Sequence, residues 1–176
     1  MKFDEKLGRF VLSVCDPHIS DSGNFDNVAE FLSQKGRSLP HSIMMMMPEA
    51  WQNDQEMDAA KKAFYTYHDA IMEPWDGPAS VCFADGDFAG AALDRNGLRP
   101  SRYTITNDGF LILASEAGCL PVDESSVTKK GKLKPGEILL VDLNKKKIVY
   151  DQEIKETICR AFPYQNWIEE HTHFLN

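Results

Sequence analysis

The chain has 176 residues, of which 43% are hydrophobic and 26% are charged, and its formal net charge is -8 at pH 7. This length and composition are typical of one domain, or part of one, with a real hydrophobic core. The negative charge argues against nucleic acid or an anionic membrane as the main partner, and no apolar run approaches the roughly 20 residues that span a bilayer. The amino terminus is a poor signal peptide, because its charged part contains acids and its apolar run is short, so we expect a cytoplasmic protein.

The amino-terminal quarter of the chain predicts one short strand and one helix. Residues 10–12 are apolar enough for a strand, and residues 20–27 form a loop with good capping side chains, in which Ser22 or Asn24 is the expected helix cap. Apolar residues then follow at helical spacing and predict a helix that ends near Gly36. They are Phe25, Val28, Ala29, Phe31 and Leu32.

The next stretch predicts further helices. Residues 39–47 contain four consecutive methionines and predict a short packing helix, which we favour over a promiscuous binding surface. Pro48 is expected to open a new helix. Residues 58–72 give the clearest helical pattern, with Ala60, Phe64, Tyr67 and Ile71 on one face and Ala63 and His68 beside it. Lys61, Lys62 and Asp69 face away, and His68 is expected to be a packing histidine.

The middle of the chain predicts an antiparallel meander of four strands. The pairs Asp85-Gly86, Asn96-Gly97 and Asp108-Gly109 are two-residue hairpin signals of the type I′ kind. Between them lie residues 80–84, 88–93, 102–106 and 110–115, which are β-branched, aromatic, or small and apolar.

The last third predicts a hairpin and a helix. Residues 118–134 read as a loop with a short strand near Val127, and residues 138–142 and 147–150 as a hairpin. Residues 153–162 predict a helix with Ile154, Ile158 and Ala161 facing inward, and residues 169–176 a frayed terminus. His171 and His173 lack further ligands nearby, so we expect no metal site. The lysines at 129–134 and 145–147 are expected at solvated turns. The whole pattern indicates an α+β chain.

The four cysteines, Cys15, Cys82, Cys119 and Cys159, are far apart and form no C-x-x-C pair. In a cytosolic protein this spacing predicts four reduced thiols, mostly buried, rather than disulfides or a zinc site.

Three segments carry a resemblance to a known family. Residues 93–100, Leu-Asp-Arg-Asn-Gly-Leu-Arg-Pro, are similar to the D-x-x-G-x-R-P segment of class II glutamine amidotransferases, and residues 114–116, Ala-Ser-Glu, to the strand that follows it. Residues 48–53, Pro-Glu-Ala-Trp-Gln-Asn, and residues 72–79, Met-Glu-Pro-Trp-Asp-Gly-Pro-Ala, narrow the match. Together they closely resemble the glutaminase domain of glutamate synthases.

The resemblance implies a fold and a reaction. The family fold is the four-layer αββα sandwich of amino-terminal nucleophile hydrolases, and residues 1–176 would supply part of it. The family hydrolyses L-glutamine to L-glutamate and ammonia, and the ammonia is passed to 2-oxoglutarate for reductive glutamate synthesis. FMN and an iron–sulfur cluster belong to later parts of the enzyme, so we expect no cofactor in this chain and the remaining parts of glutamate synthase as its partners.

The resemblance also implies one site residue. In the family, an aspartate in a loop just before a helix accepts hydrogen bonds from the α-ammonium of glutamine, and Asp21 occupies the matching place. By residue type alone it would be a capping aspartate, and Asp26 is the competitor one turn along. A carboxylate suits the role because it accepts hydrogen bonds and pairs with a cation.

We map no catalytic residue. The family nucleophile is an amino-terminal cysteine whose α-amine is the base, whereas this chain begins Met-Lys-Phe. We expect the family's oxyanion Asn-Gly and clamping arginine to lie upstream, and do not transfer their roles to Asn96, Gly97 or Arg99 in the meander. Cys15 is internal and reads as a structural thiol. The isolated chain is therefore expected to be inactive.

Two readings of the chain stay open. It is a part of a glutaminase domain that works only with the rest of the enzyme, or a non-catalytic module that binds an amino acid or a protein partner. A part of a domain should expose an apolar face and self-associate. Other amidotransferases, such as asparagine synthetase or amidophosphoribosyltransferase, fit less well because of residues 48–53 and 72–79.

Overall fold

The computed structural model describes residues 2–4, 9–11 and 14–173, and it divides the chain into two compact units, residues 1–42 and residues 43–176. The first unit begins with an antiparallel pair of short strands, β1 (Lys2–Asp4) and β2 (Arg9–Val11). The predicted strand at residues 10–12 is therefore present as residues 9–11, and Leu12 lies outside the described residues.

Helix α1 (Asp21–Gln34) follows, and Ser20 caps it by accepting a hydrogen bond from the Gly23 N–H at 3.1 Å. The prediction of Ser22 or Asn24 as the cap was wrong, because the helix begins one residue after Ser20. The apolar face is as predicted at four positions, Phe25, Val28, Ala29 and Leu32, but Phe31 is 39% exposed.

The predicted methionine helix is α2 (Leu39–Met46), and Ile43 to Met46 are each at most 4% exposed, which confirms a packing helix. Residues 48–51 do not continue as a helix, contrary to the prediction. Instead the Trp75 backbone N–H donates to the Met46 carbonyl at 2.7 Å, so the chain after α2 is tied to residues 72–79.

Helix α3 (Ala59–Asp69) has Asp58 as its cap. Its buried side contains the predicted Phe64 with Ala63 and His68 beside it, and also Tyr65, which was not predicted there. Ala63, Phe64, Tyr65 and His68 are buried, whereas Ile71 is 48% exposed. Ile71 points to solvent because the helix ends at Asp69 and no longer carries it around to the packed side.

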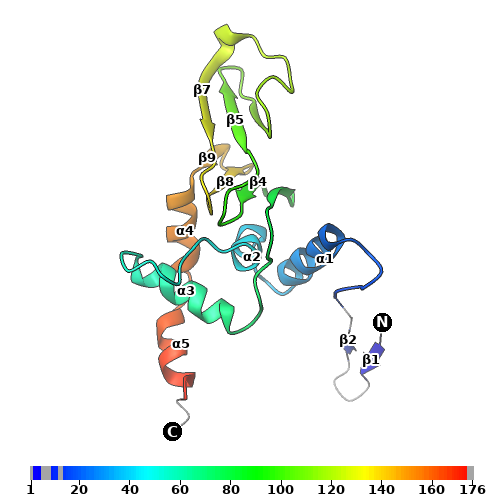
Figure 1. Cartoon of the computed structure of the whole chain (residues 1–176), viewed down its shortest axis with the longest axis vertical. Coiled ribbons are helices and arrows are strands. Elements are labelled where there is room, and N and C mark those ends of the chain that lie inside the picture. The colour runs from blue at the N-terminus through cyan, green and yellow to red at the C-terminus, as the bar shows by residue number, and fades with distance from the viewer. Residues whose placement is uncertain (1, 5–8, 12–13, 174–176) are drawn as a thin grey trace. The chain divides into compact units, whose positions relative to one another are not determined.

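Seven strands of the second unit form two antiparallel sheets (Figure 1). The four-stranded sheet has the order β3 (Ser80–Ala84), β4 (Phe88–Leu93), β8 (Ile138–Asp142) and β9 (Lys147–Val149). The three-stranded sheet has β5 (Arg102–Thr106) between β6 (Leu111–Ala114) and β7 (Val127–Lys132). One turn of 3-10 helix, η1 (Glu124–Ser126), precedes β7.

The predicted strand positions are confirmed, but the single meander is wrong. β4 pairs with β8 and β5 pairs with β7, so the chain changes sheets between Leu93 and Arg102. The Asn96-Gly97 pair closes a turn in which the Gly97 N–H donates to the Asp94 carbonyl at 3.1 Å, and that turn does not return the chain along β4. Lys129, Lys130 and Lys132 consequently lie within β7 rather than at a turn.

The pairs Asp85-Gly86 and Asp108-Gly109 do join paired strands, but their turns are not of the predicted type I′ kind. That type needs positive φ at both central residues, and Lys146 is the one non-glycine described residue with positive φ. At Asp108-Gly109 the chain makes a three-residue loop with Gly109 at φ +91°, closed by the Thr106 N–H donating to the Phe110 carbonyl at 3.0 Å. A glycine at this place in a longer loop is a recognised hairpin alternative.

One apolar core cluster of the second unit joins the two sheets. Ala91, Leu93 and Leu139 from the four-stranded sheet are each at most 2% exposed, and Leu133 joins them after β7. Tyr103, Leu111 and Leu113 from the three-stranded sheet pack against this cluster. The described residues thus form an α+β arrangement, as predicted.

Two helices follow the last strand. Helix α4 (Asp151–Cys159) contacts α3 and β8, and the Arg160 guanidinium donates to the Asp58 carboxylate at 2.7 Å. Residues 163–173 were not predicted as a helix, yet α5 (Tyr164–His171) packs beside α3 through aromatic rings (Figure 1). The ring centroids of Tyr67 and Trp167 are 5.3 Å apart. No described helix has the length and apolar character needed to cross a membrane.

Candidate functional site

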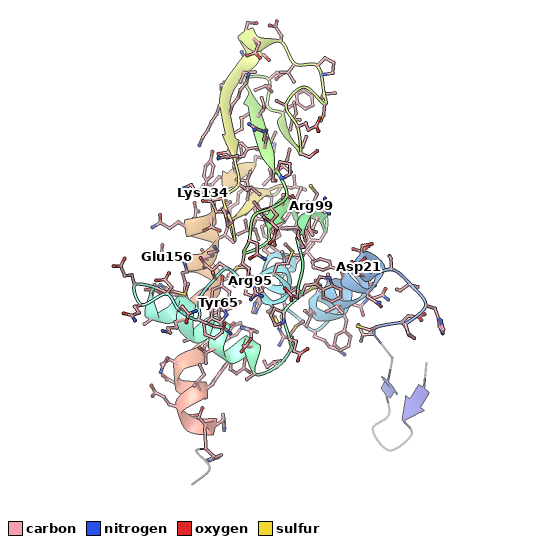
Figure 2. All side chains as sticks on the ribbon, in the orientation of Figure 1. Asp21, Tyr65, Arg95, Arg99, Lys134 and Glu156 are labelled. Carbon is pink, nitrogen blue, oxygen red and sulfur yellow. The ribbon has the colours of Figure 1, made fainter. Side chains whose placement is uncertain are left out.

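Asp21, the predicted site residue, is the first residue of α1 rather than a loop residue before it (Figure 2). Its side chain is exposed, and its carboxylate oxygen Oδ1 accepts a hydrogen bond from the Ser22 N–H at 2.8 Å. The loop before it is fixed because Asn24 bonds both the N–H and the carbonyl of Asp16, at 2.7 and 3.0 Å. A carboxylate held in this way keeps lone pairs open to solvent and can accept hydrogen bonds from an ammonium group.

The loop at residues 94–100 is held by the buried Asp94. Its carboxylate accepts hydrogen bonds from the Ala79 N–H at 3.2 Å and the Asn96 N–H at 2.8 Å. A side chain at Gly97, where φ is +62°, would meet Pro135 at 2.6 Å. Asp94 and Gly97, the first two fixed positions of the D-x-x-G-x-R-P segment, therefore shape the backbone.

The same loop contacts the Met-Glu-Pro-Trp-Asp-Gly-Pro-Ala segment. The Arg95 guanidinium lies 3.5 Å from the Asp76 carboxylate, and both side chains are largely exposed. Ala79, which donates to Asp94, is the last residue of that segment. Two of the segments that carry the family resemblance, residues 72–79 and 93–100, are therefore neighbours in the fold.

A partly buried cluster of ionisable groups connects α3, α4 and residue 49. The ammonium Nζ of Lys155, whose side chain is 4% exposed, lies 3.2 Å from Glu49 and 2.8 Å from Asp151. Lys61 lies 2.9 Å from the other oxygen of Glu49, and the Tyr65 hydroxyl donates to that oxygen at 3.1 Å. The predicted outward position of Lys61 was therefore wrong.

Burial dominates the acid–base properties of this cluster. It raises the pKa of Tyr65 well above its usual value, and the neighbouring Glu49 carboxylate adds to the shift. It also raises the pKa of Asp151, although the Lys155 ammonium opposes the shift. Both effects follow from the cost of placing charge in a low-dielectric interior.

The cluster reaches the 94–100 loop through Gly136. Lys155 donates its third hydrogen bond to the Gly136 carbonyl at 2.9 Å, and the Gly136 N–H donates to the Asp94 carbonyl at 3.0 Å. A side chain at Gly136, where φ is +73°, would meet the Cβ of Glu49 at 2.7 Å. Glu49 and Asp94, which lie in two of the signature segments, are thus joined by one chain of contacts.

The cysteines differ from their prediction. Cys159 is buried, but Cys15, Cys82 and Cys119 are exposed, so the expectation of mostly buried thiols was wrong. Burial raises the pKa of the Cys159 thiol to about 12, which makes it a poor nucleophile at neutral pH.

The histidines carry no metal-site geometry. His68 is buried and its Nδ1 lies 2.8 Å from the Phe64 carbonyl, as expected of a packing histidine. His171 belongs to α5 and not to a frayed terminus. Within residues 2–4, 9–11 and 14–173 there is no group of three or more His, Cys, Asp or Glu side chains that could hold a metal ion.

Comparison with known proteins gives consistent matches. The family model described as "Glutamine amidotransferases class-II" matches residues 2–167. The chain is 45% identical over 168 residues to the glutamate synthase [NADPH] large chain of Bacillus subtilis, covering 96% of this chain and 11% of that protein. It is 46% identical over 170 residues to the glutamate synthase [NADH] of Schizosaccharomyces pombe, covering 96% and 8%.

A third relative has a different electron donor in its name. The chain is 45% identical over 159 residues to the ferredoxin-dependent glutamate synthase of Antithamnion sp., covering 89% of this chain and 10% of that protein. The chain thus spans about a tenth of the length of these curated relatives.

Proposed function

Because the chain belongs to the class II glutamine amidotransferases, we propose that it is the later part of the glutaminase domain of a glutamate synthase. The family match over residues 2–167 carries this proposal, together with relatives at about 45% identity that are all named glutamate synthases. In the complete enzyme this domain releases ammonia from L-glutamine, and the ammonia is used to make glutamate from 2-oxoglutarate.

The cofactors of that enzyme are assigned to its other parts. The four cysteines of this chain are far apart in the sequence, and one of them is buried in α4, so they do not fit an iron–sulfur cluster. FMN and the cluster therefore enter no step that we derive for these residues.

Asp21 is the proposed binding group for the α-ammonium of glutamine. Its carboxylate is exposed and is oriented by the Ser22 N–H, so one oxygen is fixed while the other accepts further hydrogen bonds. An ammonium donating to an ionised carboxylate forms a charge-assisted hydrogen bond, which is stronger than a neutral one. The role is that of substrate binding, and the acyl-transfer chemistry needs other groups.

The nucleophile is proposed to come from residues outside this stretch. Hydrolysis of glutamine needs a thiolate and a base beside it. All four cysteines are internal, so none has the free α-amine that serves as the base in this family. The pKa of Cys159, about 12, makes that thiol unsuitable as well. We therefore expect no release of glutamate by the isolated chain.

An apolar cavity in the second unit supports completion of an αββα sandwich by other segments. It has a volume of about 750 Å³ and is lined mainly by apolar side chains of both sheets, including Phe83, Leu111, Leu113 and Val141. Phe110 and Leu143 line it as well and are 63% and 45% exposed. An apolar hollow of this size between sheets is larger than the voids that packed interiors leave.

Calorimetric titration of the purified chain with L-glutamine and L-glutamate tests the proposal. Binding that is lost in Asp21→Asn and kept in Asp26→Asn, a matched exposed aspartate on the same helix, would support the site. Light scattering and a glutamate-release assay run alongside. Glutamate release by the pure wild-type chain would contradict the assignment of the nucleophile to other residues. A monodisperse chain that binds neither amino acid would favour a stand-alone partner-binding module.

A further inference from the structure

A second cavity lies on the three-stranded sheet, on the face turned away from the core. In this sheet Arg102 pairs with Ala114 and Lys132, and Thr104 pairs with Ile112 and Lys130. These side chains share one face because residues directly opposite in a sheet point the same way. The segment from Glu116 to Glu124 follows β6 and closes a hollow of about 300 Å³ over this face. β5 and β7, which carry the basic residues, are side by side in Figure 1.

Four charged side chains line this cavity, and two of them neutralise each other. Lys130 lies 2.8 and 2.9 Å from the two carboxylate oxygens of Glu124. Arg102 and Glu116, the other two, form no ion pair with any residue that the structure describes. Both side chains are exposed, so the cavity offers a ligand one guanidinium and one carboxylate that no other described side chain pairs with.

The remaining lining is mostly apolar or small. Ile112 and Val122 are half-buried, and Leu120 is 55% exposed beside them. The Thr104 hydroxyl adds a polar group next to Arg102 along β5. The cavity volume is at the lower end of the range for small-molecule sites, so it suits a ligand of a few carbon atoms.

We propose that this cavity binds an α-amino acid with an aliphatic side chain. Arg102 would hold the carboxylate, since a guanidinium matches carboxylate geometry with two parallel hydrogen bonds. Glu116 would accept hydrogen bonds from the ammonium, and the side chain would lie on Ile112, Leu120 and Val122. A simple anion would leave Glu116 unpaired, and a simple cation would leave Arg102 unpaired, so a zwitterion fits both charges. The site uses no residue of the proposed glutamine site at Asp21.

The test is a titration of the full 176-residue chain followed by amide NMR, which reports folding and binding together. L-Leucine should shift amide signals of residues 116–122. 4-Methylpentanoate, which lacks the amine, and 3-methylbutylamine, which lacks the carboxylate, should each bind at least tenfold more weakly. Along the series L-alanine, L-norvaline and L-norleucine, each added methylene should tighten binding about threefold to fourfold, as expected for burial of one CH₂.

One arginine variant tests the site, and one lysine variant is its matched control. Arg102→Met should abolish the shifts, whereas Lys132→Met, opposite it on the same sheet face but outside the cavity lining, should leave the affinity within about twofold. Glu116→Gln should weaken L-leucine but not 4-methylpentanoate.

Several outcomes would overturn the proposal. They are an absence of shifts at 20 mM L-leucine in a folded wild-type chain, equal binding of 4-methylpentanoate and L-leucine, and retained binding in Arg102→Met. Loss of L-leucine binding in Asp21→Asn would also overturn it, because the signal would then belong to the glutamine site. Failure of glutamine to bind, with L-leucine still bound, would count against the proposed function alone.

Discussion

Replacing Lys155 by methionine tests how strongly the ionisable cluster stabilises the second unit. Methionine keeps most of the apolar stem and removes the ammonium, which makes three contacts: 3.2 Å to Glu49, 2.8 Å to Asp151 and 2.9 Å to the Gly136 carbonyl. After the change, Asp151 keeps the Ile138 N–H at 2.9 Å as a partner. The Gly136 carbonyl loses the hydrogen bond that it accepts from Lys155.

The expected loss follows from the burial of these partners. Removing one member of a buried ion pair costs about 3–5 kcal/mol, because the other member is left uncompensated. Here the side chains of Glu49 and Asp151 are 19% and 26% exposed, and Glu49 keeps Lys61. Water therefore screens part of the effect, and we expect a loss of about 2–4 kcal/mol in the free energy of unfolding. That is a large share of the roughly 5–15 kcal/mol of a typical domain.

Urea unfolding followed by tryptophan fluorescence measures this loss, because Trp51, Trp75 and Trp167 all lie in the second unit. Lys147→Met is the matched control. Its ammonium pairs with Glu153 at 2.6 Å with both side chains 53% exposed, and such surface pairs contribute about 0–1 kcal/mol. A loss for Lys155→Met no larger than that of the control, with an unchanged urea dependence, would refute the reasoning.

Three further predictions concern backbone, thiol and carboxylate. In the same urea assay, Gly136→Ala should lower the free energy of unfolding by about 1–2 kcal/mol more than Gly109→Ala. Both glycines have positive φ, but a new Cβ at position 136 would lie 2.7 Å from a side-chain carbon, whereas position 109 is open. Equal losses would mean that the neighbour moves freely. Cys159, with a pKa of about 12, should resist iodoacetamide at pH 8, where roughly one thiol in 10,000 is ionised; mass spectrometry should find three adducts on the native chain and four in urea. Backbone N–H donation lowers the pKa of Asp142 from 3.8, so the ionised carboxylate stabilises the fold above pH 3.8, and this stabilisation is lost as pH falls through the folded-state pKa. The melting temperature of Asp142→Asn should therefore lie below that of the wild type at pH 7, and the two should converge under acid. A difference in melting temperature that does not change with pH would contradict this.

Local chemistry was enough to locate most elements. The strands at residues 80–84, 88–93 and 102–106 were predicted to the residue, because turn glycines and β-forming residues act over a few positions. The pairing of the strands could not be predicted in this way, because β4 pairs with β8, which lies more than forty residues later in the sequence. Nothing in the Asn96-Gly97 pair distinguishes a hairpin turn from a turn at which the chain changes sheets.

The contacts of the ionisable cluster that the sequence did not predict share one cause. Lys155 stands between apolar positions of a predicted helix, and a lysine there is normally assigned to solvent. Its partners are Glu49 and Gly136, far away in the sequence, so the helical pattern contains no sign of them. Asp21 is proposed as a site residue only through a family resemblance, since an aspartate next to a helix start is by itself an ordinary cap.

The point where the chain leaves and rejoins the four-stranded sheet has a consequence for modularity. The Leu93 N–H donates to the Glu137 carbonyl at 3.0 Å, and the Gly136 N–H donates to the Asp94 carbonyl at 3.0 Å. Residues 95–135 include all of the three-stranded sheet. The chain therefore leaves the four-stranded sheet and rejoins it at two adjacent points, which these two hydrogen bonds hold together. An insertion of this kind can be lengthened, exchanged or shortened to a tight turn while β4 and β8 stay paired. Shortening it also requires that the apolar side chains beneath Tyr103 and Leu113 are made polar.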